Sequence, residues 1–178
     1  GLFSYIAASP TAFHATRGAH GRLLREGFAE LVMDMRWDLS SGRDYLLPLG
    51  DRALIAVRLG TRPLAEAGAT ILVAHTDSPC LRLKERGASW RKGYLALPTE
   101  MYGAPIVSTW MDRELGVAGR VVMADGAISL VDLPLRVVIP NLALHLNRKV
   151  NEGFEYNAQD HLVGIAGVLG EHDDANAE

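Results

Sequence analysis

One short run of apolar residues limits the fold of this chain more than any other feature. Ile71-Leu72-Val73-Ala74 contains no polar side chain, which is typical of a central strand that other elements cover on both faces. Earlier in the chain, Ser9 as the cap and Pro10 at the first position predict a helix that continues to Glu26 and ends at Gly27. The runs Tyr45 to Leu47 and Ala53 to Leu59, on either side of Gly50-Asp51, predict a hairpin. Together these features predict an α/β arrangement for the first part of the chain.

The second part of the chain has a different pattern. Beyond Pro79 helical spacing fades and short β-like runs take its place, with Asp125-Gly126 between two of them as a hairpin signal. Leu142 to Asn147 alternates with period two and predicts a further strand, whereas Asn157 to Gly170 is compatible with a helix that its glycines disfavour. The other β-like runs are Leu81–Lys84, Tyr94–Leu97, Ile106–Trp110, Gly119–Met123, Ile128–Val131 and Arg136–Ile139. The two predicted parts are residues 1–85, which are α/β, and residues 86–178, which are mostly β.

The composition argues against several classes of partner. A formal net charge of -3 and a pI of about 6.1 disfavour nucleic acid and an anionic membrane surface. No apolar run approaches the roughly 18 residues that a membrane span needs. The single cysteine, Cys80, rules out a disulfide within the chain and fits a reducing, cytoplasmic setting.

The apolar run ends on His75-Thr76-Asp77, which is a favourable place for a metal ligand. A strand end fixes the backbone, and the loop beyond it opens into a crevice outside the sheet. His75 can offer a neutral ring nitrogen to a divalent metal. Asp77 can accept a hydrogen bond from the other ring nitrogen, which fixes the tautomer and makes the ligand more basic. By itself, the same pattern also fits a histidine that caps a turn, with an Asx-type bond from the aspartate.

Four stretches of the chain, taken together and in this order, resemble the M18 metallopeptidases, the aspartyl aminopeptidase family. They are "ASPTAFHATRGAHGRLLREGFAEL" from Ala8, "AHTDSPCLRLK" from Ala74, "TEMYGAPIVSTWMDRELGVAGRVV" from Thr99 and "VIPNLALHLNRKVNEGF" from Val138. The resemblance implies a zinc-dependent aminopeptidase that removes N-terminal residues from peptides, with a preference for Asp and Glu. It also implies that two metal ions per complete active site activate the attacking water. Zinc is the expected metal, with other divalent ions as alternatives.

The resemblance also implies roles for single residues and for the two parts of the chain. His75 would bind one zinc ion, and Asp77 would orient His75 from behind. His145 would reach from one subunit into the active site of its neighbour and contact the substrate there. Residues 1–85 would form the first part of a zinc-peptidase-like α/β catalytic domain. Residues 86–178 would form a β-rich dimerisation domain, through which the protein builds homodimers and larger homo-oligomers.

A further matching pair, Asp112-Arg113, is interpreted as a local ion pair that positions a loop. It is not expected to take part in the chemistry directly.

The chain departs from the family in its length and in its ligand set. The family's chains are more than twice as long, and its remaining carboxylate and histidine ligands lie in later segments that have no match here. We therefore expect one metal ligand from this chain, as part of a longer enzyme. One alternative is a catalytically incomplete oligomerisation or binding module derived from such an enzyme. Another is a different two-metal hydrolase with the same strand end.

Overall fold

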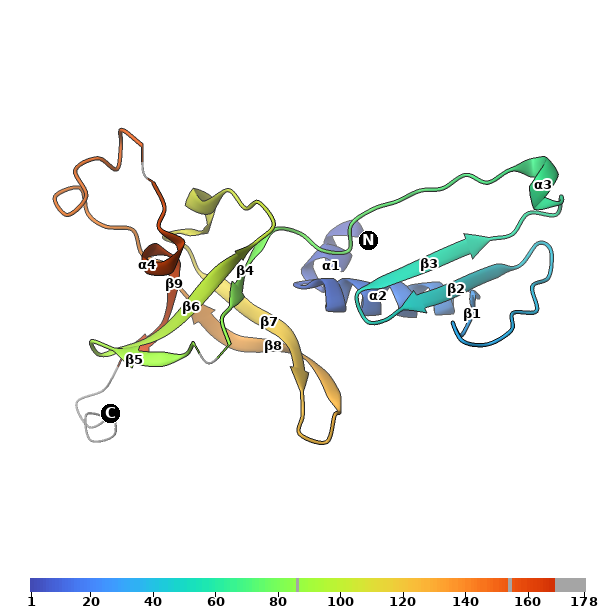
Figure 1. Ribbon diagram of the computed structural model, residues 1–178, viewed down its shortest axis with the longest axis horizontal. Coiled ribbons are helices and arrows are strands. Elements are labelled where there is room, and N and C mark those ends of the chain that lie inside the picture. Colours follow the sequence, from blue (N-terminus) through green and yellow to red (C-terminus); the bar gives the residue numbers. More distant parts are fainter. Residues whose placement is uncertain (86, 154, 169–178) are drawn as a thin grey trace. The chain divides into compact units, whose positions relative to one another are not determined.

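The computed structural model describes residues 1–85, 87–153 and 155–168, and these form a mixed α/β structure (Figure 1). The chain divides into two compact units. The first unit comprises residues 1–78 and 118–131, and the second comprises residues 79–117 and 132–178. The assignment of residues 1–85 and 86–178 to a catalytic and a dimerisation domain stays a prediction. Among the described residues, no helix has the length and the apolar character that crossing a membrane requires.

The first unit is built on a three-stranded sheet in the order β1-β2-β3. β1 runs parallel to β2, whereas β2 and β3 form the predicted antiparallel hairpin around Gly50. The Gly50 backbone has a φ of 66°, which glycine adopts without steric cost. The elements of this unit are α1 Leu2–Ala7, α2 Ala12–Arg25, β1 Ala29–Glu30, β2 Asp44–Leu49, β3 Ala53–Arg58 and α3 Leu64–Ala67.

Helix α2 begins two residues later than predicted, because Thr11 and not Ser9 is its cap. Thr11 has an extended backbone, and its side-chain oxygen accepts a hydrogen bond from the backbone N–H of His14. The same oxygen lies 2.8 Å from Nδ1 of His14, so the His14 ring supports the cap. α2 packs against β2 and β3, where Tyr45, Leu46 and Leu47 are buried.

The prediction of a buried strand over Ile71 to Ala74 is wrong for this structure. The segment forms no helix or strand, and the exposed fractions of Ile71, Leu72 and Val73 are 80%, 92% and 90%. A strand is stable only when neighbouring strands take its backbone hydrogen bonds and other elements cover its faces. No strand in the described part of the chain pairs with this segment. The run therefore has the composition of a central strand, but it lacks the neighbouring strands that would stabilise one.

The second unit is organised around β6, the central strand of a four-stranded sheet (Figure 1). β6 pairs antiparallel with β4, β5 and β9, and Leu97, Ile139 and Leu162 are among the residues buried in this unit. The strands are β4 Cys80–Leu83, β5 Ser89–Arg91, β6 Tyr94–Tyr102, β7 Leu115–Val122, β8 Ile128–Val137 and β9 Val163–Val168, with the 3-10 helix η1 Val107–Trp110 and the helix α4 Ala158–His161. β7 and β8 pair as predicted around Asp125-Gly126, and the two units share this hairpin.

Three further predictions for this unit are corrected by the structure. Ile106 to Trp110 contributes a 3-10 helix in place of a strand. Leu142 to Asn147 forms a turn, since the backbone N–H groups of Leu146 and Asn147 both donate to the carbonyl of Ala143. Its alternating pattern has no partner strand to stabilise an extended conformation in the described ranges. From Asn157 only α4 is helical, and the glycines and β-branched residues that follow form β9; residues 169 and 170 lie outside the described part.

Candidate functional site

His75 and Asp77 lie in direct contact at the end of the apolar run. Nδ1 of His75 is 2.8 Å from Oδ1 of Asp77. An ionised carboxylate only accepts hydrogen bonds, so this contact favours the tautomer with the proton on Nδ1. Nε2 then carries the lone pair that a metal ion would need.

The pair is open to solvent in this structure. The exposed fraction of the His75 side chain is 90%, and that of Asp77 is 33%. Exposure leaves the His75 ring accessible to a ligand, but it also leaves the ring without packing that would fix its orientation. The contact with Asp77 is therefore what orients the ring within the described part of the first unit.

Thr76, between the two, anchors this turn to the sheet. Its hydroxyl donates a hydrogen bond of 2.6 Å to the backbone carbonyl of Arg52, in the turn that joins β2 and β3. No local sequence pattern could indicate this contact, because Thr76 and Arg52 are 24 positions apart. The residues that bear the predicted metal chemistry are thus attached to the first sheet through Thr76.

His145 lies in the second unit, whereas His75 and Asp77 lie in the first. It is exposed and occupies the turn over Leu144 to Leu146. The structure therefore brings His75 and Asp77 together, and it shows His145 on a separate surface turn. The predicted role of His145 across a subunit boundary stays a prediction.

A single candidate metal ligand does not make a metal site. Across residues 1–85, 87–153 and 155–168, no three side chains of His, Cys, Asp or Glu gather into a group that could hold a metal ion. Catalytic zinc sites use three protein ligands and leave one position open. The described residues alone therefore offer His75 as one candidate ligand for such a site.

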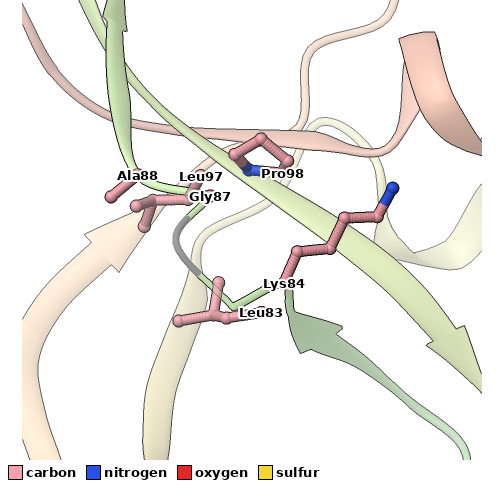
Figure 2. Close-up of a pocket in the computed structure, with 6 residues that line it drawn as sticks. All are labelled: Leu83, Lys84, Gly87, Ala88, Leu97 and Pro98. Carbon is pink, nitrogen blue, oxygen red and sulfur yellow. The ribbon is translucent and has the colours of Figure 1, made fainter.

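Neither of two open pockets contains the predicted site residues. The first, of about 430 Å³ in the second unit, is lined by Leu83, Lys84, Gly87, Ala88, Leu97 and Pro98 (Figure 2). Lys84 is the one charged residue among the described lining residues. It extends away from Leu83 and Ala88, and its Nζ donates a 2.6 Å hydrogen bond to Gln159. The other described lining residues are apolar side chains and a glycine, and these offer no acid or base to a reaction.

The second pocket, of about 250 Å³, lies in the first unit between α2, the β2–β3 turn and β8. Its polar lining includes His20 and Glu30, which lie 3.0 Å apart, and Asp51, which pairs with Arg120. The lining also contains Arg17, and it does not include His75.

Comparison with known proteins identifies the family. The family described as aminopeptidase I zinc metalloprotease (M18) matches residues 5–178. The chain belongs to the M18 family. The probable M18 family aminopeptidase 2 of Pseudomonas aeruginosa PAO1 is 44% identical over 173 residues, which cover 95% of this chain. The protein of the same description from Ectopseudomonas mendocina is 41% identical over 180 residues, which cover 99% of this chain.

The fold of this M18 chain is also found in solved structures. A chain in the cryo-EM structure of the Ape4 and Nbr1 complex superposes with a TM-score of 0.85 at 32% identity, covering 98% of this chain and 35% of that one. The chain spans 40% of the length of the Pseudomonas aeruginosa relative and 42% of the length of the Ectopseudomonas mendocina relative.

Proposed function

We propose that this chain is the first part of a zinc-dependent aminopeptidase. The observation that carries the proposal is the contact of His75 with Asp77 in a chain that belongs to the M18 family. No three metal-binding side chains gather among the described residues, and the chain spans less than half the length of its relatives. The remaining ligands would come from segments that this chain does not contain.

His75 fits the role of a zinc ligand. Asp77 engages Nδ1, so Nε2 is the nitrogen that would bind the metal, and the exposed ring leaves room for other ligands around it. Two bound zinc ions would supply a polarised carbonyl and an acidified water at the active site. In that reaction Asp77 holds the tautomer of His75 and makes its ring more basic.

The preference for an N-terminal Asp or Glu is part of the proposal and rests on the family resemblance. His145 would contact the substrate from a neighbouring subunit, and the second unit would form the contact between copies in homodimers and larger assemblies. Exposed apolar side chains on this unit, among them Ile106, Leu142 and Leu144, provide surface for such a contact. A cytoplasmic location is supported by the single cysteine.

The test uses the complete protein that carries this chain. Purified protein is assayed for bound metal and for hydrolysis of Asp-, Glu-, Leu- and Lys-anilides. About two zinc ions per chain and faster turnover of the Asp- and Glu-anilides would support the proposal. Turnover of other amides alone would indicate a different two-metal hydrolase. No bound metal and no turnover would indicate an oligomerisation or binding module and would contradict the proposal.

A further inference from the structure

Asp112 has an unusual backbone conformation for a residue other than glycine. Its φ is 54°, in the left-handed region, where asparagine and aspartate are the residues best tolerated after glycine. Such a conformation costs free energy and persists only where surrounding contacts hold it. Asp112 directly follows Met111, which is buried with an exposed fraction of 8%.

Asp112 holds the chain on both sides of Pro140. Its backbone N–H donates a 2.9 Å hydrogen bond to the carbonyl of Ile139. Its side-chain oxygen Oδ1 accepts a 2.8 Å hydrogen bond from the backbone N–H of Asn141. Pro140 itself has no N–H to donate. Ile139 is almost fully buried, with an exposed fraction of 1%. Asp112 therefore links a buried residue of the core to Asn141, where the chain leaves the core.

The segment that leaves the core at Asn141 carries His145 four residues later (orange in Figure 1). The backbone hydrogen bonds described for residues 142–153 close turns within that segment. Leu146 and Asn147 donate to Ala143, and Glu152 donates to Lys149. Bonds of this kind shape the turn but do not fix it to the sheet. The bond from Asn141 to Asp112 is therefore the tether next to His145 on its N-terminal side.

The neighbouring residue, Arg113, binds a different backbone segment. Its Nη1 donates a 3.0 Å hydrogen bond to the carbonyl of Thr109, in η1. The pair Asp112-Arg113 thus acts through two backbone contacts, each side chain holding a different segment. The carboxylate is directed to the segment that carries His145, and the guanidinium is directed to η1.

We propose that Asp112 is a positioning residue, which fixes the turn that carries His145 by holding the backbone of Ile139 and Asn141. This inference rests on the proposed function for its effect on catalysis, where His145 contacts the substrate. The two hydrogen bonds between Asp112 and the backbone belong to this chain, and their effect can be measured without an activity assay.

The first experiment measures amide hydrogen exchange over residues 139–147 in Asp112→Gly and Asp112→Asn. Glycine keeps the left-handed backbone and removes the acceptor, so exchange at Asn141 is expected to become about tenfold faster. Asparagine tolerates the same backbone and retains an acceptor oxygen, so its exchange is expected to stay close to wild type. Lys92→Gly is the matched control, because Lys92 has a φ of 50° in the β5–β6 turn. Unchanged exchange in Asp112→Gly would overturn the proposal.

The second experiment measures kcat and KM for the same variants in the complete protein. Asp112→Gly is expected to lower kcat roughly tenfold to a hundredfold, because a displaced His145 no longer meets the substrate correctly. Asp112→Asn is expected to keep kcat close to the wild-type value. In a His145→Ala background, Asp112→Gly is expected to have no further effect.

The outcomes separate the two proposals. An equal loss of kcat with and without His145 would show a general structural role and overturn the positioning role. Faster exchange without any change in kcat or KM would overturn it as well. If the wild-type complete protein hydrolyses no anilide, the proposed function fails, and the exchange measurement alone decides whether Asp112 holds the segment.

Discussion

At the scale of the residue, His75 is a side chain whose replacement reports on metal binding and not on folding. Its side chain is 90% exposed, so its removal leaves no cavity. His75→Ala is therefore expected to change the free energy of unfolding of this chain by less than about 0.5 kcal/mol. In the complete protein it is expected to abolish turnover and to lower the zinc content. His20→Ala is the control, because His20 contacts Glu30 on the first unit and lies outside the motif. Retained zinc and turnover in His75→Ala would contradict the assignment.

A substitution of Asp77 tests whether the orientation of the His75 ring matters for metal binding. Asp77→Asn keeps an oxygen that can accept from Nδ1 of His75 but removes the negative charge. Groups that orient a metal ligand typically contribute 10- to 100-fold in affinity, so about this loss of zinc affinity is expected in the complete protein. Competition with a chelator of known affinity measures it. Wild-type affinity in Asp77→Asn would show that the charge of Asp77 has no part in metal binding.

Thr76 is the residue whose role the sequence did not indicate. Thr76→Val removes the hydroxyl that donates to the Arg52 carbonyl and keeps the shape of the side chain. The expected cost is about 0.5–1 kcal/mol in the free energy of unfolding, which urea denaturation measures. Thr76→Ser is the control, since serine retains the donor. A loss in Thr76→Ser as large as the loss in Thr76→Val would show that the hydroxyl does not account for the effect.

At the scale of the element, local signals predicted those parts of the fold that depend on neighbouring residues. The hairpin around Gly50 and the hairpin around Asp125-Gly126 both form, because turn residues and strand pairing act over short separations. The run Ile71 to Ala74 and the run Leu142 to Asn147 do not form strands. Their patterns match strands, but a strand also needs distant partners, which no pattern within the run can specify.

The contact of His75 with Asp77 joins residues two positions apart, so a sequence motif could indicate it. The contacts of Thr76 with Arg52 and of Asp112 with Asn141 join residues 24 and 29 positions apart. These depend on how the chain folds back, so the supports of the candidate site became visible only in the structure.

The β7–β8 hairpin allows a test at this scale. Gly126 has a φ of 83°, which a side chain disfavours, so Gly126→Ala is expected to destabilise the protein by about 1–2 kcal/mol. Gly119 lies in β7 without a positive φ, and an added Cβ there would meet no atom within 4 Å. Gly119→Ala is therefore expected to be close to neutral. Thermal unfolding measures both variants, and equal effects would contradict the role of the turn conformation.

At the scale of the whole molecule, the exposed run Ile71 to Ala74 indicates surface that the complete protein would cover. Leu72 is 92% exposed in this chain, so Leu72→Asp is expected to change its stability by less than about 0.5 kcal/mol. In a complete protein that covers this run, the same change would bury a charge among apolar side chains and is expected to cost several kcal/mol. Leu2→Asp, in α1 with an exposed fraction of 69%, is the control for a surface leucine. An equally small effect of Leu72→Asp in both proteins would show that the run stays exposed.

Metal removal tests the proposal that this chain shares a zinc site with further segments of a longer protein. A single histidine ligand cannot hold zinc tightly, so the 178-residue chain is expected to lose its zinc on dialysis against a weak chelator. The complete protein, with its further ligands, is expected to keep zinc under the same conditions. It should lose activity only with a strong chelator and regain it when zinc is added back. Metal analysis before and after dialysis measures both proteins. Tight zinc binding by the 178-residue chain would mean that its own residues complete the site, and activity that survives full metal removal would rule out zinc catalysis.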